Sequence, residues 1–372
     1  MSRPRVVVAG LGDSGLLTAI HLARADVDVV GISSKPGLVS GQELGMRLAR
    51  PEAWARDYRV GFDRFRRLDG AELVHAELTG LDPGTRTVTV DDGRATRAVG
   101  YDVLVVATGV SNGFWRRPAL QTEAEVTATL AQAHEQIAGA ATLLVVGGGA
   151  AAVASAYQCA TRWPALRVTL AFPGERALPQ HHPRTWAHVR RRLLAAGVEL
   201  RPGHRAVVPE GFDCDRITAG PVAWSSGPEP LSADAVLWAI GRVRPNTGWL
   251  PADLLDEHGF VRVGPDLRVA GLPDAFAVGD VAATDPLRSS ARNRADKLVA
   301  ANVRAHLAGR TLGEFRPARR RWGSVLGVED DGLRVFTPAG RPFRFPAWAV
   351  GAVLQPWIVR RGIYRGIRDL PR

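Results

Sequence analysis

Cysteine is almost absent from this chain of 372 residues, which contains only Cys159 and Cys214. The two are far apart in the sequence, and no CxxC pair occurs. Their scarcity excludes a disulfide framework of the kind that small secreted domains need, and it excludes chemistry that runs through a disulfide of the chain's own. Low cysteine content suits a reducing compartment, and we predict a cytoplasmic location.

Lysine is nearly absent as well, so the formal net charge of +11 comes almost entirely from arginine. Most of the excess lies in the C-terminal segment, where twelve arginines face five acidic residues from Leu312 onward. Because no zinc-ligand spacing, RNP motif or helix-turn-helix pattern accompanies this charge, we predict no metal site and no nucleic-acid partner. The adjacent His181 and His182 lack a third ligand and are expected in a surface loop.

The chain also has little room for a signal peptide, because its first apolar strand begins at Arg5. Its hydrophobic fraction of 46% and charged fraction of 23% are ordinary for a globular protein. The length predicts two domains with a small additional segment.

Two glycine-rich turns, each between an apolar strand and a helical segment, are the most informative features present. Residues 10–15 read GLGDSG and residues 147–152 read GGGAAA. In such a turn the first glycine permits the tight bend, the second lets the backbone approach a pyrophosphate, and the third position allows close helix–strand packing. Free N–H groups and the positive end of the helix dipole then face the phosphates. Two such turns predict two dinucleotide sites.

The segments around these turns suggest one α/β plan used twice. A buried strand ends at Thr108-Gly109, and a similar strand ends at Ile240-Gly241. The sequence Val278-Gly279-Asp280 follows another short apolar strand, and Thr122 with Glu125 forms a capping box ahead of a helix. Residues 87–93 carry a hairpin signal.

With these motifs in this order, the chain resembles the two-dinucleotide-binding flavoproteins of the pyridine nucleotide-disulfide oxidoreductase superfamily. Within it, the chain is most similar to type II NADH:quinone oxidoreductases and to apoptosis-inducing-factor-like reductases of the ferroptosis-suppressor type. The resemblance implies an α/β fold of two Rossmann-like doubly wound domains, the second inserted in the first. An FAD-binding domain would comprise residues 1–115 and 246–311, an NAD(P)-binding domain residues 116–245, and a small C-terminal segment residues 312–372.

The resemblance also implies the site residues. Those for FAD are Gly10, Gly12, Asp13, Ser14, Gly15, Ser33, Ser34, Lys35, Thr108, Gly109, Gly279, Asp280, Ser290 and Ala291. Those for NADH or NADPH are Gly147, Gly149, Ala150, Ala151, Ala152, Phe172, Arg176, Ile240 and Gly241. No catalytic side chain is expected, because the cofactor carries the chemistry.

Three positions depart from the family pattern. Ser33 stands where an acid usually binds the FAD ribose, and Phe172 stands where an acid selects NADH. The loss of that second acid, with Arg176 and Arg184 nearby, favours NADPH slightly over NADH. Ala154 replaces a glutamate that commonly lies near the nicotinamide, so either the nucleotide is held otherwise or the second site has lost its hydride role.

The resemblance predicts an FAD-dependent NAD(P)H oxidoreductase that passes electrons to a quinone or a similar acceptor. Three alternatives stay open: a ferredoxin-type reductase, a specialised flavin oxidase or tailoring enzyme, and a flavin-bearing sensor of low turnover. Whether the protein forms the homodimer that is common in the family is also open.

The C-terminal segment at 346–368 interleaves apolar and aromatic residues with arginines but is too short to span a bilayer. Two expectations remain open for it: peripheral contact with the inner face of a membrane, or packing on the flavin domain with its arginines in water.

Overall fold

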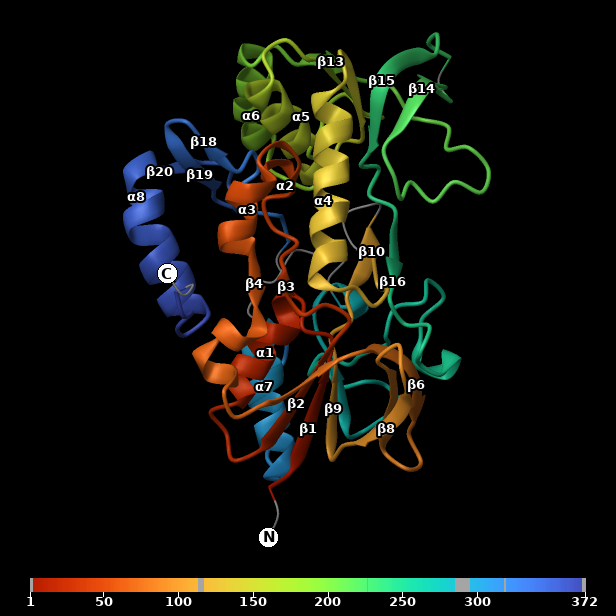
Figure 1. Ribbon diagram of the computed structural model, residues 1–372, viewed down its shortest axis with the longest axis vertical. Helices are drawn as coiled ribbons and strands as arrows, with labels where there is room; N and C mark the ends of the chain where they lie inside the picture. The colour runs from red at the N-terminus through yellow and green to blue at the C-terminus, as the bar shows by residue number, and fades with distance from the viewer. Residues whose placement is uncertain (1–2, 113–116, 226, 285–294, 318, 370–372) are drawn as a thin grey trace.

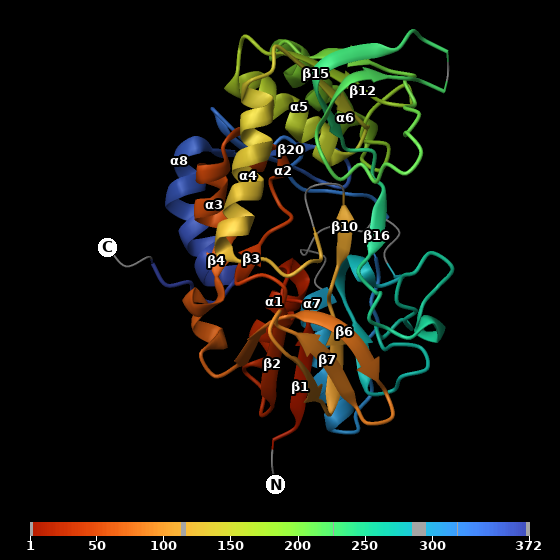
Figure 2. The same cartoon turned by 45° about the vertical axis from the view of Figure 1, so that its right-hand side comes forward.

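The computed structural model describes residues 3–112, 117–225, 227–284, 295–317 and 319–369. The molecule is elongated, with one five-stranded sheet at each end and the C-terminal segment along one side (Figures 1 and 2). The predicted FAD residues Ser290 and Ala291 lie outside the described residues.

The first sheet has the strand order β17-β9-β1-β2-β5, and all its pairings are parallel. Its strands are β1 (Arg5–Ala9), β2 (Asp28–Ser33), β5 (Glu72–His75), β9 (Val103–Val106) and β17 (Ala275–Ala277). Val6 and Val8 point into one apolar cluster, whereas Val7 and Ala9 point into another. Because both faces of β1 are buried, its sequence is continuously apolar rather than alternating.

Different elements cover the two faces of this sheet. The helices α1 (Asp13–Leu22) and α7 (Ala295–Leu307) share the cluster of Val6 and Val8. The antiparallel sheet β6 (Glu77–Asp82), β7 (Thr87–Asp91) and β8 (Thr96–Gly100) contributes to the other cluster. Strands β7 and β8 form the hairpin that residues 87–93 predict.

The second sheet has the strand order β13-β12-β11-β15-β14. Its strands are β11 (Thr142–Val146), β12 (Arg167–Ala171), β13 (Glu199–Arg201), β14 (Thr218–Val222) and β15 (Leu231–Trp238), of which only β14 is antiparallel to its neighbour. Its helices are α4 (Glu123–Ala138), α5 (Ala150–Arg162) and α6 (Pro183–Ala195). The predicted capping box is present, since Thr122 and Glu125 each accept a hydrogen bond from the other's backbone N–H.

Two crossover strands join the ends of the molecule. Strand β10 (Val110–Asn112) pairs antiparallel with β16 (Val243–Pro245), and both lie between the two sheets in Figure 1. The chain also makes an excursion after β2, through β3 (Gly37–Val39), α2 (Leu44–Ala49), α3 (Pro51–Tyr58) and β4 (Arg59–Gly61). Short 3₁₀ turns occur at Phe62–Arg64, Arg66–Leu68, Ala252–Leu254 and Gly279–Val281.

The C-terminal segment contains the small sheet β18 (Val328–Glu329), β19 (Gly332–Phe336) and β20 (Pro342–Pro346). It then continues as α8 (Ala347–Ala349) and a π-helix over Val350–Ile363.

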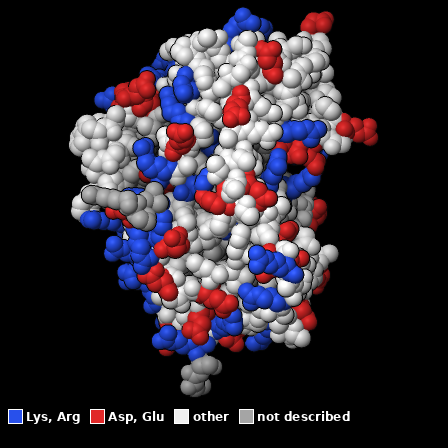
Figure 3. Space-filling view, viewed as in Figure 1, with Lys and Arg blue, Asp and Glu red and all other residues white. Residues whose placement is uncertain are grey.

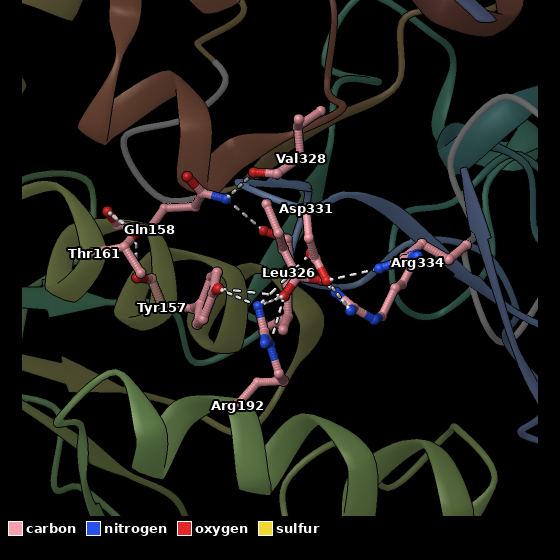
Figure 4. A network of polar contacts seen from close by, with 10 residues as sticks. Tyr157, Gln158, Thr161, Arg192, Leu326, Val328, Asp331 and Arg334 are labelled. Carbon is pink, nitrogen blue, oxygen red and sulfur yellow. Dashed lines mark hydrogen bonds and ion pairs between the residues drawn. The ribbon is translucent and has the colours of Figure 1, made fainter. Parts of the chain in front are cut away.

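A polar network attaches this small sheet to α5 and α6 (Figure 4). The buried carboxylate of Glu329 accepts hydrogen bonds from Arg192 Nε at 2.7 Å, Arg334 Nη1 at 2.7 Å and the Tyr157 hydroxyl at 3.2 Å. The next residue of α5, Gln158, donates from its Nε2 to the carbonyls of Leu326 and Val328 at 2.7 and 3.0 Å. The small sheet is therefore bound to the second parallel-sheet unit through side chains as well as apolar packing.

Candidate functional site

A cavity of about 810 Å³ opens at the carboxyl ends of β1, β2 and β9. In open α/β sheets this edge is where ligands bind, and the volume is in the range of cofactor sites. The cavity brings together most of the residues that the sequence predicts for FAD, namely Gly10, Gly12, Asp13, Ser14, Ser33, Ser34, Lys35, Thr108, Gly109, Gly279 and Asp280.

The first glycine turn has a different steric reason for each of its glycines. Gly10 has φ +100°, and a Cβ there would lie 2.6 Å from the Ala107 carbonyl oxygen. Gly15 packs directly against the backbone of Gly10, which leaves no room for a side chain. At Gly12 nothing lies within 4 Å of an added Cβ. The fold therefore requires Gly10 and Gly15, whereas a side chain at Gly12 would only fill space that a ligand's phosphates could occupy.

Two other segments close around this turn. The Asp13 carboxylate accepts hydrogen bonds from Ser40 Oγ at 2.6 Å and from the Gly41 N–H at 2.8 Å, which fixes the start of the excursion. From much later in the chain, Gly279 approaches Ser14 so closely that an added Cβ would lie 2.8 Å from its hydroxyl oxygen. This approach places Asp280 in the cavity wall beside α1.

Serine and lysine side chains occupy the wall at the end of β2. Ser33 Oγ accepts a hydrogen bond from the Lys35 N–H at 3.1 Å, and Lys35 Nζ donates to Ser34 Oγ at 3.2 Å and to the Ala119 carbonyl. Burial lowers the pKa of Lys35 to about 8, partly opposed by the negative charges of Glu77 and Glu125. At neutral pH the Lys35 side chain is therefore mostly protonated.

Several lining residues have no counterpart in our predictions. They include Arg47, Glu77, Thr79, Gln121, Asn246 and Trp249. Asn246 is the clearest case, because Asn246 Nδ2 donates to the Thr108 carbonyl at 2.9 Å and Asn246 Oδ1 accepts from Ser111 at 2.8 Å. These bonds tie the two crossover strands together at the cavity. Asn246 is far from Thr108 and Ser111 in the sequence, and no sequence pattern links them. Its position in the cavity wall is therefore apparent only from the fold.

The second glycine turn repeats the geometry of the first. Gly147 has φ +138° and packs against the backbone of Ala239, whereas at Gly149 nothing lies within 4 Å of an added Cβ. Ala152, at the third position, is completely buried. Ala150 and Ala151 begin α5, and Ile240 and Gly241 follow β15 on the neighbouring strand. The turn therefore offers an open backbone at Gly149.

Two of the predicted nucleotide contacts have other roles in the structure. The Phe172 side chain is 1% exposed and packs edge-on against Trp186, so it belongs to the apolar core. The Arg176 guanidinium donates to the carbonyls of Leu178, Pro179 and His181 at 3.1–3.3 Å, and so holds its own loop. Their roles in nucleotide binding remain predictions.

The expectation of a surface position is wrong for His181. The residue is 7% exposed, and burial, followed by the charges of Arg321 and Arg176, lowers its pKa to about 4. The cause is the C-terminal segment, which covers this loop through hydrogen bonds from Arg321 to Gln180. His182 instead caps α6 by accepting the Arg184 N–H at 3.1 Å.

Two mainly parallel sheets, each with a glycine turn of this geometry at its carboxyl edge, define a protein with two dinucleotide-binding units. The chain belongs to the pyridine nucleotide-disulphide oxidoreductase family, whose model matches residues 4–304. The predicted Rossmann-like α/β fold and the predicted class, an oxidoreductase with FAD and a nicotinamide nucleotide as cofactors, are confirmed.

Individual comparisons agree with this family. An NADH dehydrogenase-like protein of Mycobacterium tuberculosis is 32% identical over 317 residues, covering 75% of this chain and 73% of that protein. A type II NADH:quinone oxidoreductase of the same organism is 27% identical over 371 residues, covering 85% and 75%. The crystal structure of a ferredoxin reductase from Rhodopseudomonas palustris has a TM-score of 0.67 at 19% identity, covering 92% of this chain and 88% of that one. The chain spans 64% of the length of a further relative, an oxidoreductase of Pestalotiopsis fici.

Proposed function

We propose that the protein is an FAD-dependent NAD(P)H oxidoreductase that passes electrons to a quinone or a similar small acceptor. The observation that carries this proposal is the repeated glycine-turn geometry, with an open second glycine at Gly12 and at Gly149. Two units of this kind in one chain are suited to bring a nicotinamide nucleotide and FAD together. Residues 1–115 and 246–311 would form the FAD domain, residues 116–245 the NAD(P) domain, and residues 312–372 an acceptor-facing segment.

The cavity residues fit FAD by their chemistry. The backbone at Gly12 and the first turn of α1 would bind the pyrophosphate through N–H groups and the helix dipole. Asp280 would accept a hydrogen bond from a ribityl hydroxyl, and Ser33 with Lys35 would donate to the ribose oxygens that an acid usually binds. When bound, FAD supplies the hydride acceptance and electron transfer that no side chain offers.

The second site would bind its nucleotide along the start of α5. Gly147 forms the tight bend, Gly149 leaves the backbone open, and the N–H groups of Ala150–Ala152 face the pyrophosphate. Ile240 and Gly241 would flank the other end of the nucleotide.

The C-terminal surface supports a quinone-like acceptor reached at a membrane. Trp348 and Trp357 are 70% and 57% exposed, and Val353 and Ile358 are also exposed. The guanidinium carbon of Arg361 lies 4.2 Å from the centre of the Trp357 ring. On the face seen in Figure 3, the α8 end of this segment is free of charged side chains, and basic side chains gather below it. Aromatic groups beside arginines are typical of segments that lie in the interface of anionic membranes.

Among the residues that the structure describes, we find no helix with the length and apolarity needed to cross a bilayer. We therefore propose peripheral contact through residues 346–368. The relative named as a type II NADH:quinone oxidoreductase supports a quinone acceptor. The second candidate acceptor is an acidic iron–sulfur protein. Two observations support it: the fold is similar to that of a ferredoxin reductase, and the basic surface could bind an acidic partner.

An anaerobic titration tests the proposal. The purified protein should be yellow, and NADH or NADPH should bleach its flavin absorbance. Addition of a short-chain quinone should then restore the absorbance. A yellow protein that neither nucleotide bleaches would contradict the reductase and favour an oxidase or a sensor. A protein that bleaches but is reoxidised only by ferredoxin would move the acceptor to the second candidate.

A further inference from the structure

Arginines from two distant parts of the chain gather around the loop that follows β12. Arg176 and Arg184 belong to the loop and to the first turn of α6, and Arg320 and Arg321 come from the C-terminal segment. Arg321 donates its N–H to the Gln180 carbonyl at 3.2 Å and its Nε to Gln180 Oε1 at 2.6 Å. These contacts fix the C-terminal segment on the loop.

A second contact brings the small C-terminal sheet to the same place. A Cβ at Gly340 would lie 2.9 Å from His182 Nδ1 and 3.0 Å from Arg184 Cβ. The β19–β20 turn therefore packs against the start of α6, beside Arg184.

The positive charges of two arginines in this cluster are not paired within the described residues. Arg184 and Arg320 are exposed, and neither forms an ion pair within the described part of the chain. The first turn of α6 contains no acidic residue, although a helix N-terminus favours anions and disfavours cations. Over the whole loop from Phe172 to His182, Glu175 is the single acid.

Two histidines lie beside these arginines. Burial lowers the pKa of His182, and Arg320, Arg184 and Arg176 lower it further. The neighbouring His181 is buried, and its Nδ1 has no hydrogen-bond partner among the described residues. The place is therefore suited to receive an anion.

The loop lies beside the second glycine turn. The Leu178 N–H donates to the Gly148 carbonyl at 2.7 Å, and a Cβ at Gly148 would lie 3.2 Å from Phe172 Cβ. In a dinucleotide fold, the adenosine ribose lies at this edge of the second strand, where an acid binds the ribose hydroxyls of NADH and arginines bind the 2′-phosphate of NADPH. Here the strand ends in a buried Phe172, so no carboxylate at the strand end would repel that phosphate.

We propose that the second site selects NADPH, and that Arg184 and Arg320 bind its 2′-phosphate. Arg320 would be a specificity-determining residue supplied from outside the nucleotide-binding unit, and Arg176 would shape the loop through its three carbonyl contacts. This inference rests on the proposed assignment of the second site to a nicotinamide nucleotide.

Binding of nucleotide fragments to the oxidised protein tests the inference without turnover. We would measure the affinities of adenosine 2′,5′-bisphosphate, adenosine 5′-monophosphate and inorganic phosphate by calorimetry. The bisphosphate should bind at least about tenfold more tightly than the monophosphate, since it adds charge-assisted hydrogen bonds. Each of R184Q and R320Q should weaken the affinity for the bisphosphate about tenfold and leave the affinity for the monophosphate unchanged.

The matched control is R190Q, an exposed arginine further along α6, which should leave all three affinities unchanged. Equal affinities of the bisphosphate and monophosphate, or unaltered preference in R184Q and R320Q, would overturn the inference. Tight binding of inorganic phosphate alone would show a general anion site and would overturn it as well. Because flavin bleaching is a separate measurement, a protein bleached preferentially by NADH would refute NADPH selection while leaving the proposed reductase intact.

Discussion

Gly45 in α2 packs directly on the carbonyl group of Ala154 in α5, with no room for a methyl group between the two helices. The contact joins the excursion of the first unit to the helix that begins at the second glycine turn. A second contact between the same segments is a hydrogen bond at 2.7 Å that Arg50 Nη1 donates to Gln158 Oε1. Ala154 stands where the family resemblance predicts a glutamate. Because the backbone of Ala154 itself lies against α2, this helix contact requires the glycine at position 45.

Gly45→Ala should therefore weaken the junction between the two units. An added methyl group must displace the α5 backbone rather than a flexible side chain, and such overpacking costs about 1–3 kcal/mol. Thermal unfolding should show a lower Tm. Gly70→Ala is the control, since nothing lies within 4 Å of a Cβ at Gly70. A Gly45→Ala protein as stable as the control would contradict the close packing.

Gly12 and Gly149 allow the two nucleotide sites to be tested one at a time. Both have space for a side chain in the protein, so Gly12→Val and Gly149→Val should fold. Gly12→Val should be isolated without FAD, because the side chain would fill the pyrophosphate position. Gly149→Val should keep its yellow colour but need at least about tenfold more NAD(P)H for bleaching. Circular dichroism and the flavin spectrum check both results, and a yellow Gly12→Val protein would refute the assignment of the first site.

Local sequence signals predict the geometry of the two glycine turns well, since each turn combines strand, bend and helix within about 20 residues. The structure gives Gly10, Gly12 and Gly15 the steric environments that the pattern predicts, and it places Gly279 against Ser14 and Asp280 in the cavity wall. The hairpin at 87–93 and the cap at Thr122 were predictable for the same reason, because each depends on neighbouring residues.

Contacts between distant segments could not be predicted. Asn246 joins two crossover strands, and Gly45 meets Ala154 across two units, yet neither residue belongs to a local motif. His181 shows the consequence for a site prediction. Its sequence context is that of an exposed loop, but a segment about 140 residues later buries it. The side-chain environment in such places depends on the tertiary fold.

Glu329→Gln should detach the small C-terminal sheet from α5 and α6. The Glu329 side chain is 1% exposed, and neutralising it would remove the buried acidic partner of Arg192 and Arg334 and leave them only the more exposed Asp331. Breaking a buried ion pair costs about 3 kcal/mol or more. Hydrogen exchange should show that residues 328–346 open more readily by about that amount. Asp330→Asn, at an exposed neighbouring position, should leave the exchange unchanged.

His181 should make stability depend on pH. Its pKa of about 4 in the folded protein lies below the ordinary value of 6.5, so the unfolded chain binds the proton more readily. The contribution is complete above pH 6.5 and is lost as the pH falls towards 4, by about 3 kcal/mol. Urea unfolding at a series of pH values should show this slope, and His181→Gln should reduce it. Since His182 and His188 also have lowered pKa values, some slope should remain.

Trp348 and Trp357 should carry the membrane contact if the C-terminal segment lies on a lipid surface. Flotation with vesicles that contain an anionic phospholipid should recover the wild-type protein, and salt should weaken the binding because arginines contribute. The double variant Trp348→Ala/Trp357→Ala should bind the vesicles at least about tenfold more weakly, since each substitution removes an indole that serves as a large apolar anchor. Trp322→Ala is the matched control, because Trp322 is 54% exposed but lies outside residues 346–368. Equal vesicle binding by the wild type and both variants would place the membrane contact outside Trp348 and Trp357. No vesicle binding by the wild type would favour an acceptor that the protein meets in solution.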